Sequence, residues 1–288
     1  MNIIPSSKIS FGPEEEDAII KCLRSGWITT GPITEEFEIA FAKYTAADAA
    51  VSTSSGTSAL KIALDLIDLK EGDEVITPSF TWVSVPNLIR LKGARPVFCD
   101  IDPSTLNIQP DDIEHRVTSR TKAIIPVHFA GRPAQMDTIC EIAEKYELVI
   151  IEDACHAIGT IYNERRVGGH GRMAAFSFHP NKNMTTAEGG MLCLDRSFVD
   201  RAKQMRFHGI SRDSFKRFKG KDLPYYETVF PSIKMNLTDL ASSIGLCQLQ
   251  KVDLFNEKRT NIAKEYIRQL EPLKDLIFIP SINCDGGK

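Results

Sequence analysis

The stretch AAVSTSSGTSALKIALDLI, residues 49–67, decides the fold class of this chain. Its first five residues are small or β-branched and indicate a buried strand, whereas residues 58–67 carry apolar side chains at helical spacing. Between the two, Gly56 lets the backbone approach another group closely. A strand that enters a helix through so short a turn is typical of an α/β protein.

The same alternation continues along the chain. We expect further strands at residues 73–78, 95–101, 122–129 and 148–153, and helices at residues 58–67, 82–93, 111–117 and 135–147. This order predicts a parallel sheet with helices on both faces. Two more strands, at 174–178 and 191–195, are joined by a loop without helical periodicity, which favours a local antiparallel pair and a mixed sheet.

The second half of the chain changes character. A helix is expected at 197–209, and the charged, aromatic and irregular stretch 211–235 follows it. Long irregular stretches inside compact chains are usually functional or mobile. Residues 238–273 then predict a long helix. We place a large domain at 1–245 and the start of a smaller second domain at 246–288.

Bulk composition excludes several classes of protein. The chain has 288 residues, 42% of them hydrophobic, and a formal net charge of −3, so it has no basic footprint for nucleic acid. No run of 18 apolar residues indicates a membrane span, and the first residues lack the pattern of a secretory signal. Seven cysteines with wide spacing and no CxxC pair fit a reducing cytoplasm rather than a zinc or disulfide framework, and no metal site is expected.

Two strand ends carry features that suit a flat, phosphate-bearing ligand. In STSSGTSAL (52–60), Gly56 and Thr57 open a helix whose N-terminal amides would attract a phosphate, although an ordinary cap with a turn glycine explains the same residues. In PSFTWVS (78–84), Trp82 follows a strand and could stack on a ring, although a core role is the more common one for a tryptophan.

A third strand ends in acidic residues. VIIEDACHA (149–157) places Glu152 and Asp153 at the end of an apolar strand, with His156 three residues later. An acid in this position can hold a metal or a cationic ring nitrogen, or it can cap the next helix. The strand also resembles the magnesium-binding strand of nucleotide hydrolases, but no GxxxxGK[ST] motif accompanies it.

The loop FSFHPNKNMTTAEGGM (176–191) holds a single lysine, Lys182. Alone it would be a solvated lysine, but a lysine whose pKa is lowered by burial can act as a Schiff-base nucleophile. Together the four features supply a phosphate cradle, a stacking ring, an acid and an amine. Those are the groups that pyridoxal 5'-phosphate requires, and few other cofactors require all of them.

The sequence resembles the DegT/DnrJ/EryC1/StrS sugar aminotransferases, which have the aspartate-aminotransferase fold of type I, over nearly its whole length. It is most similar to the branch that aminates 4-keto nucleotide sugars, including the UDP-4-keto-pentose aminotransferase of lipid A modification. The motifs that carry the resemblance are GWITTGP (26–32), SSGTSAL (54–60), EVITPSFTWVS (74–84), IPVHFAG (125–131), IIEDACHAIG (150–159), FSFHPNKNMTTAEGGM (176–191), RFHGI (206–210) and KMNLTDL (234–240).

The resemblance implies a mostly parallel seven-stranded sheet and a role for each site residue. Lys182 would hold the cofactor aldehyde, Asp153 would pair with the pyridine nitrogen, and His156 would lie near the ring hydroxyl. The other implied positions are Trp82 stacked on the ring, Gly56, Thr57 and Ser177 at the phosphate, Asn236 at the phosphate of a neighbouring subunit, and Trp27 and Thr29 near the nucleotide sugar.

The resemblance also implies the reaction and the assembly. The substrates would be a nucleotide-diphosphate keto-sugar, aminated at C4, and an amino donor such as glutamate, and a cytoplasmic homodimer would share its active sites. Family members usually continue well past the position of Lys288, so we expect the second domain to be incomplete here.

Two alternatives share the fold. Related sugar 3-dehydratases carry histidine in place of the cofactor lysine, so Lys182 argues against that activity. A non-catalytic regulatory protein, or an inactive fragment, would not need the complete set of cofactor residues.

Overall fold

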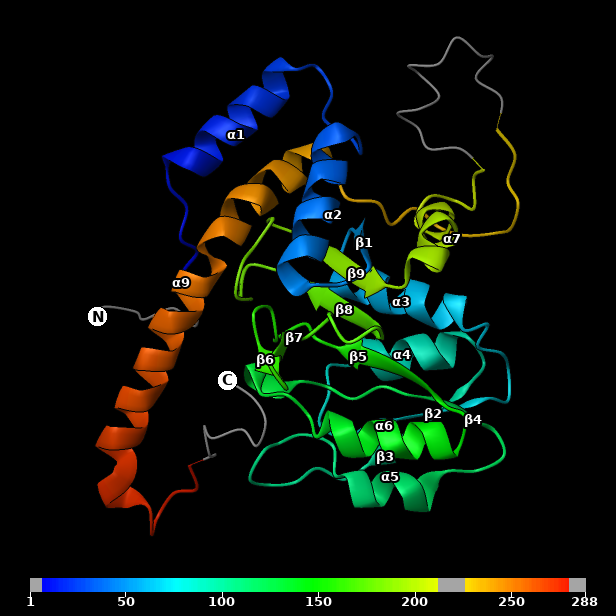
Figure 1. The fold of residues 1–288 in the computed structure, drawn as a ribbon, viewed down its shortest axis with the longest axis vertical. Coiled ribbons are helices and arrows are strands. Elements are labelled where there is room, and N and C mark those ends of the chain that lie inside the picture. The colour runs from blue at the N-terminus through cyan, green and yellow to red at the C-terminus, as the bar shows by residue number, and fades with distance from the viewer. Residues whose placement is uncertain (1–6, 212–225, 280–288) are drawn as a thin grey trace.

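A seven-stranded sheet forms the centre of the protein in the computed structural model, which describes residues 7–211 and 226–279 (Figure 1). In their order across the sheet, the strands are β1 (Ala49–Thr53), β9 (Gly190–Leu194), β8 (Met173–Ser177), β5 (Val149–Asp153), β4 (Thr121–Ile124), β2 (Glu74–Pro78) and β3 (Arg95–Cys99). Strand β9 is antiparallel to both of its neighbours, and the other pairings are parallel. The carboxyl ends of the other six strands therefore meet at one edge of the sheet.

Helices cover both faces of this sheet (Figure 1). They are α1 (Pro13–Arg24), α2 (Pro32–Thr45), α3 (Gly56–Leu66), α4 (Ser84–Leu91), α5 (Pro110–Arg116), α6 (Met136–Lys145), α7 (Val199–Met205) and α9 (Asp239–Leu270). Successive residues of β8 point to opposite faces, as in any strand. Met173 and Ala175 pack in the core below α3, α4 and α7, whereas Ala174 and Phe176 pack in the core below α2 and α9.

The remaining elements are short. The 3₁₀ turns are η1 (Phe129–Gly131), η2 (Arg196–Phe198) and η3 (Glu271–Leu273), and the small hairpin consists of β6 (Ile161–Tyr162) and β7 (Arg165–Arg166). The mixed sheet and the antiparallel β8–β9 pair confirm the expectations from sequence.

One expected strand is shorter than predicted. The run 122–129 was expected to be a strand throughout, but β4 ends at Ile124 and the chain turns at η1. Pro126 has no backbone N–H to give to a neighbouring strand, and the buried His128 is held by side-chain hydrogen bonds instead. The apolar run 122–129 therefore predicts a longer strand than the backbone forms, because the proline within it cannot continue the strand pairing.

The helices α2 and α9 are joined at their N-termini by one buried carboxylate. Oδ1 of Asp239 accepts hydrogen bonds from the backbone N–H of Gly31 (2.8 Å) and Thr34 (2.9 Å) and from the Thr34 hydroxyl (2.6 Å). Its Oδ2 accepts from Ile33 N–H at 3.2 Å. Asp239 thus caps α2, although it belongs to the first turn of α9, whose own cap is Thr238.

Two expectations are left as predictions. The proposed domain boundary between residues 245 and 246 falls inside the continuous helix α9. Most of the irregular stretch 211–235, residues 212–225, lies outside the described residues. Among the helices within residues 7–211 and 226–279, none has the length and apolar composition needed to cross a membrane.

Candidate active site

Three of the residues singled out from the sequence meet at the carboxyl edge of the sheet. Asp153 is the last residue of β5 and is 5% exposed, His156 follows it, and Lys182 lies in the loop between β8 and β9. Burial lowers the pKa of His156 below its ordinary value, the Lys182 charge lowers it further, and Asp153 opposes the shift. The imidazole therefore lies within reach of both charges.

The loop that holds Lys182 is fastened on two sides. The Lys182 N–H donates to the His179 carbonyl at 2.9 Å, which bends the loop back on itself. On the α9 side, the Arg259 guanidinium donates to the carbonyls of Lys182 and Asn183, both at 3.3 Å. The side chain of Asn183 also bonds Asn256 of α9 at 2.6 Å. The lysine backbone is thus held by its own loop and by a helix.

Glycine allows α3 to start against the ends of β5 and β8. A Cβ added to Gly56 would lie 2.8 Å from Cys155 Sγ and 2.9 Å from Ser177 Cβ, distances that are too short for real contacts. A Cβ added to Gly190 would lie 2.4 Å from the Ser55 carbonyl carbon and oxygen. The SSGT turn therefore needs glycine on both sides of the contact. This close approach brings the first-turn amides of α3 beside Ser177.

Cys155 is a residue of this contact that the sequence did not single out. Its thiol lies between Asp153, Gly56 and the Ala175 carbonyl. Burial raises the pKa of the Cys155 thiol well above its ordinary value, and the Asp153 charge adds to that shift. The side chain acts here as a small packing group rather than as a nucleophile.

The second acid of the motif, Glu152, has a different environment from Asp153. It is 1% exposed and bonds His128 Nε2 at 2.8 Å and Arg172 Nε at 2.8 Å. Burial alone would raise the pKa of Glu152, but the hydrogen bond from His128 and the positive charge of Arg172 hold this pKa at about 2. Both of its oxygens have partners within the protein, so Glu152 supports the strand end. Asp153 Oδ1 accepts a hydrogen bond from the Cys155 backbone N–H at 3.1 Å, and the Asp153 charge acts on His156.

Aromatic rings continue outward from His156. The Phe129 ring meets the imidazole edge to face, with centroids 5.9 Å apart, and Phe80 lies 4.7 Å from Phe129 on the other side. Trp82, on the same loop as Phe80, is 73% exposed, and Thr57 is also exposed. Phe129 belongs to the IPVHFAG motif, but its ring contact with His156 depends on a turn that the sequence does not reveal.

The remaining expected residues gather around Thr30. The Trp27 indole N–H donates to the Thr30 carbonyl at 3.1 Å, and Asn236 Nδ2 donates to the Thr30 hydroxyl at 2.5 Å. The Thr29 carbonyl accepts from Asp239 N–H at 3.2 Å, while its side chain is exposed. Among the described residues, the buried Oδ1 of Asn236 has no hydrogen-bond partner.

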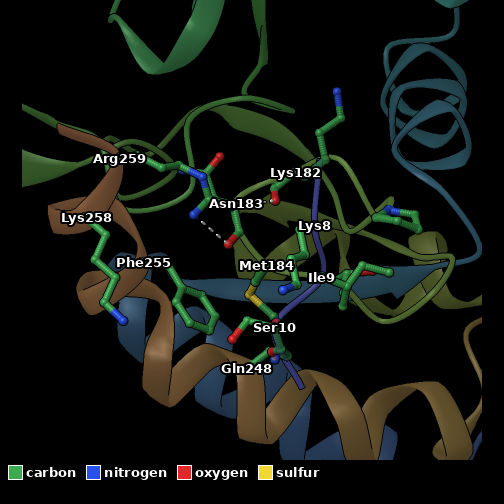
Figure 2. Close-up of a pocket in the computed structure, with 12 residues that line it drawn as sticks. Lys8, Ile9, Ser10, Lys182, Asn183, Met184, Gln248, Phe255, Lys258 and Arg259 are labelled. Carbon is green, nitrogen blue, oxygen red and sulfur yellow. Dashed lines mark hydrogen bonds between the residues drawn. The ribbon is translucent and has the colours of Figure 1, made fainter. Parts of the chain in front are cut away.

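A cavity of about 180 Å³ lies on the other side of the Lys182 loop, between the N-terminal segment and α9 (Figure 2). Met184, Gln248 and Phe255 line it together with the cations Lys8, Lys258 and Arg259. In Figure 2 the Lys182 side chain points away from Met184 and Gln248. Lys182 is one of the residues that line this cavity, although its side chain points away from Met184 and Gln248 and its charge acts on His156.

The residues at the sheet edge fit a phosphorylated pyridine ring. The turn at Gly56 places helix amides beside the Ser177 hydroxyl, which is the donor set that a phosphate requires. A buried acid, an amine and an exposed indole lie on the neighbouring strand ends.

Solved structures with the same fold support this reading. Spr1654 from Streptococcus pneumoniae, in its PMP form, is 32% identical with a TM-score of 0.88, and the match covers 93% of this chain and 72% of that one. TlmJ from Streptoalloteichus hindustanus is 30% identical with a TM-score of 0.89, covering 99% and 76%. DesV from S. venezuelae, in complex with a ketimine intermediate, is 31% identical with a TM-score of 0.85, covering 96% and 71%.

Spr1654 is also known in a PLP form. The cofactor of this chain is accordingly pyridoxal 5'-phosphate, and the chain is a PLP-dependent aminotransferase. The model of one protein family matches residues 10–282, which is nearly the whole sequence. The chain belongs to the DegT/DnrJ/EryC1/StrS aminotransferase family.

Proposed function

We propose that this enzyme transfers an amino group, from a donor such as glutamate, to C4 of a keto-sugar carried on a nucleotide diphosphate. The observation that carries the proposal is the convergence of Lys182, Asp153, His156 and the Gly56–Ser177 contact at one edge of the sheet. The sugar class is supported by Spr1654, which carries the provisional name of a sugar aminotransferase. The preference for C4 is supported by the similarity of motifs such as GWITTGP to the 4-keto nucleotide-sugar branch.

Each residue has a distinct task in this proposal. When bound, pyridoxal phosphate supplies an aldehyde that carries the amino group and a ring that accepts electrons. Asp153 keeps the proton on the ring nitrogen, since a buried carboxylate beside that nitrogen stabilises its cationic form. His156 would donate a hydrogen bond to the ring hydroxyl. Gly56, Thr57 and Ser177 would hold the phosphate, and Trp82 would cover the ring face.

Lys182 does the proton chemistry. With the cofactor bound, the Lys182 Nζ would be the amine that holds the cofactor aldehyde, and the donor amine would displace it. The freed Lys182 amine would then hold and move the proton of the donor α-carbon. In the second half of the reaction the same amine moves a proton in the opposite direction, to the sugar carbon.

The test of cofactor attachment uses the purified chain with pyridoxal phosphate. We expect a visible absorbance band, and borohydride should trap the cofactor as a secondary amine on Lys182, located by peptide mass. Lys182→Ala should abolish trapping, whereas Lys258→Ala, on the far side of the same loop, should leave it intact. Trapping at another lysine, or none in the wild-type chain, would contradict the proposal.

The test of the substrate uses ¹⁵N-labelled glutamate with a set of 3-keto and 4-keto nucleotide sugars. We expect ¹⁵N at C4 of a nucleotide amino-sugar, identified by NMR. Label at C3, or on a substrate without a nucleotide, would replace the proposed substrate while leaving the amino-transfer chemistry in place.

A further inference from the structure

The turn between β4 and α6 is held more firmly than its length requires. Its central residue, Ala130, has φ +52°, and Gly131 has φ +85°. The left-handed region is strained for alanine, and such strain persists only where the surroundings fix it. The turn therefore needs partners that hold it in place.

Asn107 supplies three of these partners. Its Oδ1 accepts from Phe129 N–H at 2.9 Å, and its Nδ2 donates to the carbonyls of Arg132 (3.1 Å) and Pro133 (3.0 Å). The side chain is 3% exposed, so these bonds are made away from water. Thr160 adds a fourth, since its hydroxyl donates to the Gly131 carbonyl at 2.7 Å.

His128 anchors the two ends of the turn. Its Nδ1 accepts from Ala134 N–H at 3.1 Å, which leaves the ring proton on Nε2 to bond Glu152 at 2.8 Å. Its backbone N–H donates to the Asp153 carbonyl at 3.1 Å. The turn is thereby fastened to the strand that carries the candidate acid.

This turn presents one backbone N–H to the active site. Ala130 N–H donates to His156 Nδ1 at 3.4 Å, and the Phe129 ring packs edge to face on the imidazole. A nitrogen that accepts a hydrogen bond carries no proton. The neutral imidazole of His156 therefore has its proton on Nε2.

We propose that Asn107 and Thr160 are positioning residues that, through the 129–133 turn, fix His156 as the neutral tautomer protonated at Nε2. The turn also opposes the charging of His156, because protonation at Nδ1 would break the bond from Ala130. The charges whose fields reach this imidazole are Lys182 and Asp153, and the neighbouring Cys155 thiol stays neutral because of its burial. Only the use of the Nε2 proton, as a donor to the cofactor, rests on the proposed function.

The test observes His156 in the cofactor-free protein by ¹⁵N NMR. The chain has six histidines, so selective labelling with His156→Gln as the assignment variant resolves the signal. In the wild-type protein we expect an unprotonated Nδ1 and a protonated Nε2. In Asn107→Asp and Thr160→Val, we expect mixed tautomers and a His156 pKa raised by about half a unit to one unit, the size of one lost hydrogen bond.

The matched control is Thr45→Val, which removes a buried hydroxyl that bonds only within α2 and to Cys193. It should leave the His156 tautomer and pKa unchanged. Asn107→Asp keeps the acceptor for Phe129 and the size of the side chain but places a charge in a buried position. If that charge prevents folding, Thr160→Val alone tests the proposal. A wild-type His156 protonated at Nδ1, or a folded Thr160→Val protein with wild-type His156 signals, would overturn the inference.

Failure of the proposed function gives a different pattern. Loss of borohydride trapping at Lys182 contradicts the role of the lysine and says nothing about the tautomer, because the NMR samples contain no cofactor. Conversely, a wild-type His156 tautomer in Asn107→Asp and Thr160→Val would contradict the positioning role of these residues and would leave the trapping result unaffected.

Discussion

Gly56 lies at a contact where a single methyl group has no room. In Gly56→Ala the added Cβ would press on Cys155 and Ser177, and neither the strand end nor the helix start can move freely. We expect a loss of about 1 to 3 kcal/mol in the free energy of unfolding, as for other overpacked sites. We also expect a marked rise in the Kd for pyridoxal phosphate, measured by fluorescence titration.

Gly72→Ala is the control for this variant. Gly72 has φ +88° and open space around its Cα, so alanine there is strained, at a cost of about 1 kcal/mol, without touching the site. It should lower stability and leave the Kd for the cofactor unchanged. Equal effects of the two variants on the Kd would show that Gly56 acts only through stability.

Ionisation of Glu152 makes the stability of the fold depend on pH. The ordinary pKa of its carboxyl is 4.5 and its folded-state pKa is about 2, so its contribution to stability is complete above pH 4.5 and is lost as the pH falls towards 2. We expect Glu152→Gln to be less stable than wild type at pH 7, with the difference shrinking between pH 5 and pH 2. Urea unfolding at several pH values measures this.

The exposed Glu144 of α6 provides the matched control. Glu144→Gln should follow the wild-type curve at every pH, because no buried partner loses a charge. A constant gap between wild type and Glu152→Gln across the whole range would mean that the variant acts through packing rather than through ionisation.

The candidate site residues that could be predicted from the sequence lie at or shortly after the ends of strands. Gly56, Asp153 and Lys182 could be picked out because motifs at strand ends bring them to one edge of a parallel sheet. Asn107 and His128 were not singled out, because their roles depend on partners in turns whose shape no periodicity describes. A buried asparagine looks the same in sequence whether it supports a site or a distant loop.

At the scale of elements, Asp239 couples the starts of two helices. In Asp239→Ala, three backbone N–H groups at the start of α2 and the Thr34 hydroxyl lose their acceptor in a buried place. We expect a loss of about 2 kcal/mol or more in the free energy of unfolding, which exceeds the usual value for a single cap. Chemical denaturation followed by circular dichroism measures it.

Asp200 offers a comparison of the same chemistry without the coupling. It lies exposed in the first turn of α7, so Asp200→Ala should cost only a few tenths of a kcal/mol, roughly the value of a charge near a helix dipole. If Asp239→Ala and Asp200→Ala lower the free energy of unfolding by the same amount, the hydrogen bonds from α2 to Asp239 add no more stability than a charge at an ordinary helix start.

The elements themselves were predictable where the periodicity was long or the strand was buried. The helix α9 and the strands β5 and β8 lie close to their expected positions. The helices α1 and α2 were missed, although each begins with a proline at its first position and has a glycine before it. Both helices pack against α9, which lies more than two hundred residues away in the sequence. The local sequence pattern was therefore weak evidence for a helix on its own.

At the scale of the whole molecule, we propose that Asn236, whose Oδ1 has no hydrogen-bond partner among the described residues, serves the active site of a neighbouring subunit. If Asn236 serves the site of a neighbouring subunit, Lys182→Ala and Asn236→Asp chains refolded together should form mixed dimers with one intact site each. Each variant alone should lack activity with glutamate and a keto nucleotide sugar, and the mixture should recover a fraction of the wild-type rate.

Lys182→Ala mixed with Asp153→Asn is the matched control, because both residues serve the site of their own chain. No mixed dimer of that pair contains an intact site, so the mixture should stay inactive. Activity in neither mixture, with mixed dimers shown by mass spectrometry, would place Asn236 within the site of its own chain.

The position of β1 in the sheet has a consequence for how the protein forms. Within residues 7–211 and 226–279, β1 has a single neighbour, β9, so residues 49–53 can join the sheet only after residues 190–194 are available. Contacts so distant in sequence form late, and chains that depend on them fold slowly. During synthesis, the helix start at Gly56 leaves the ribosome early but meets Ser177 and Gly190 only after β9 has emerged. The contact of Gly56 with Ser177 and Gly190 is thus among the last parts of the sheet to be completed, and if it holds the cofactor phosphate as proposed, we expect the cofactor to bind only after the sheet is closed.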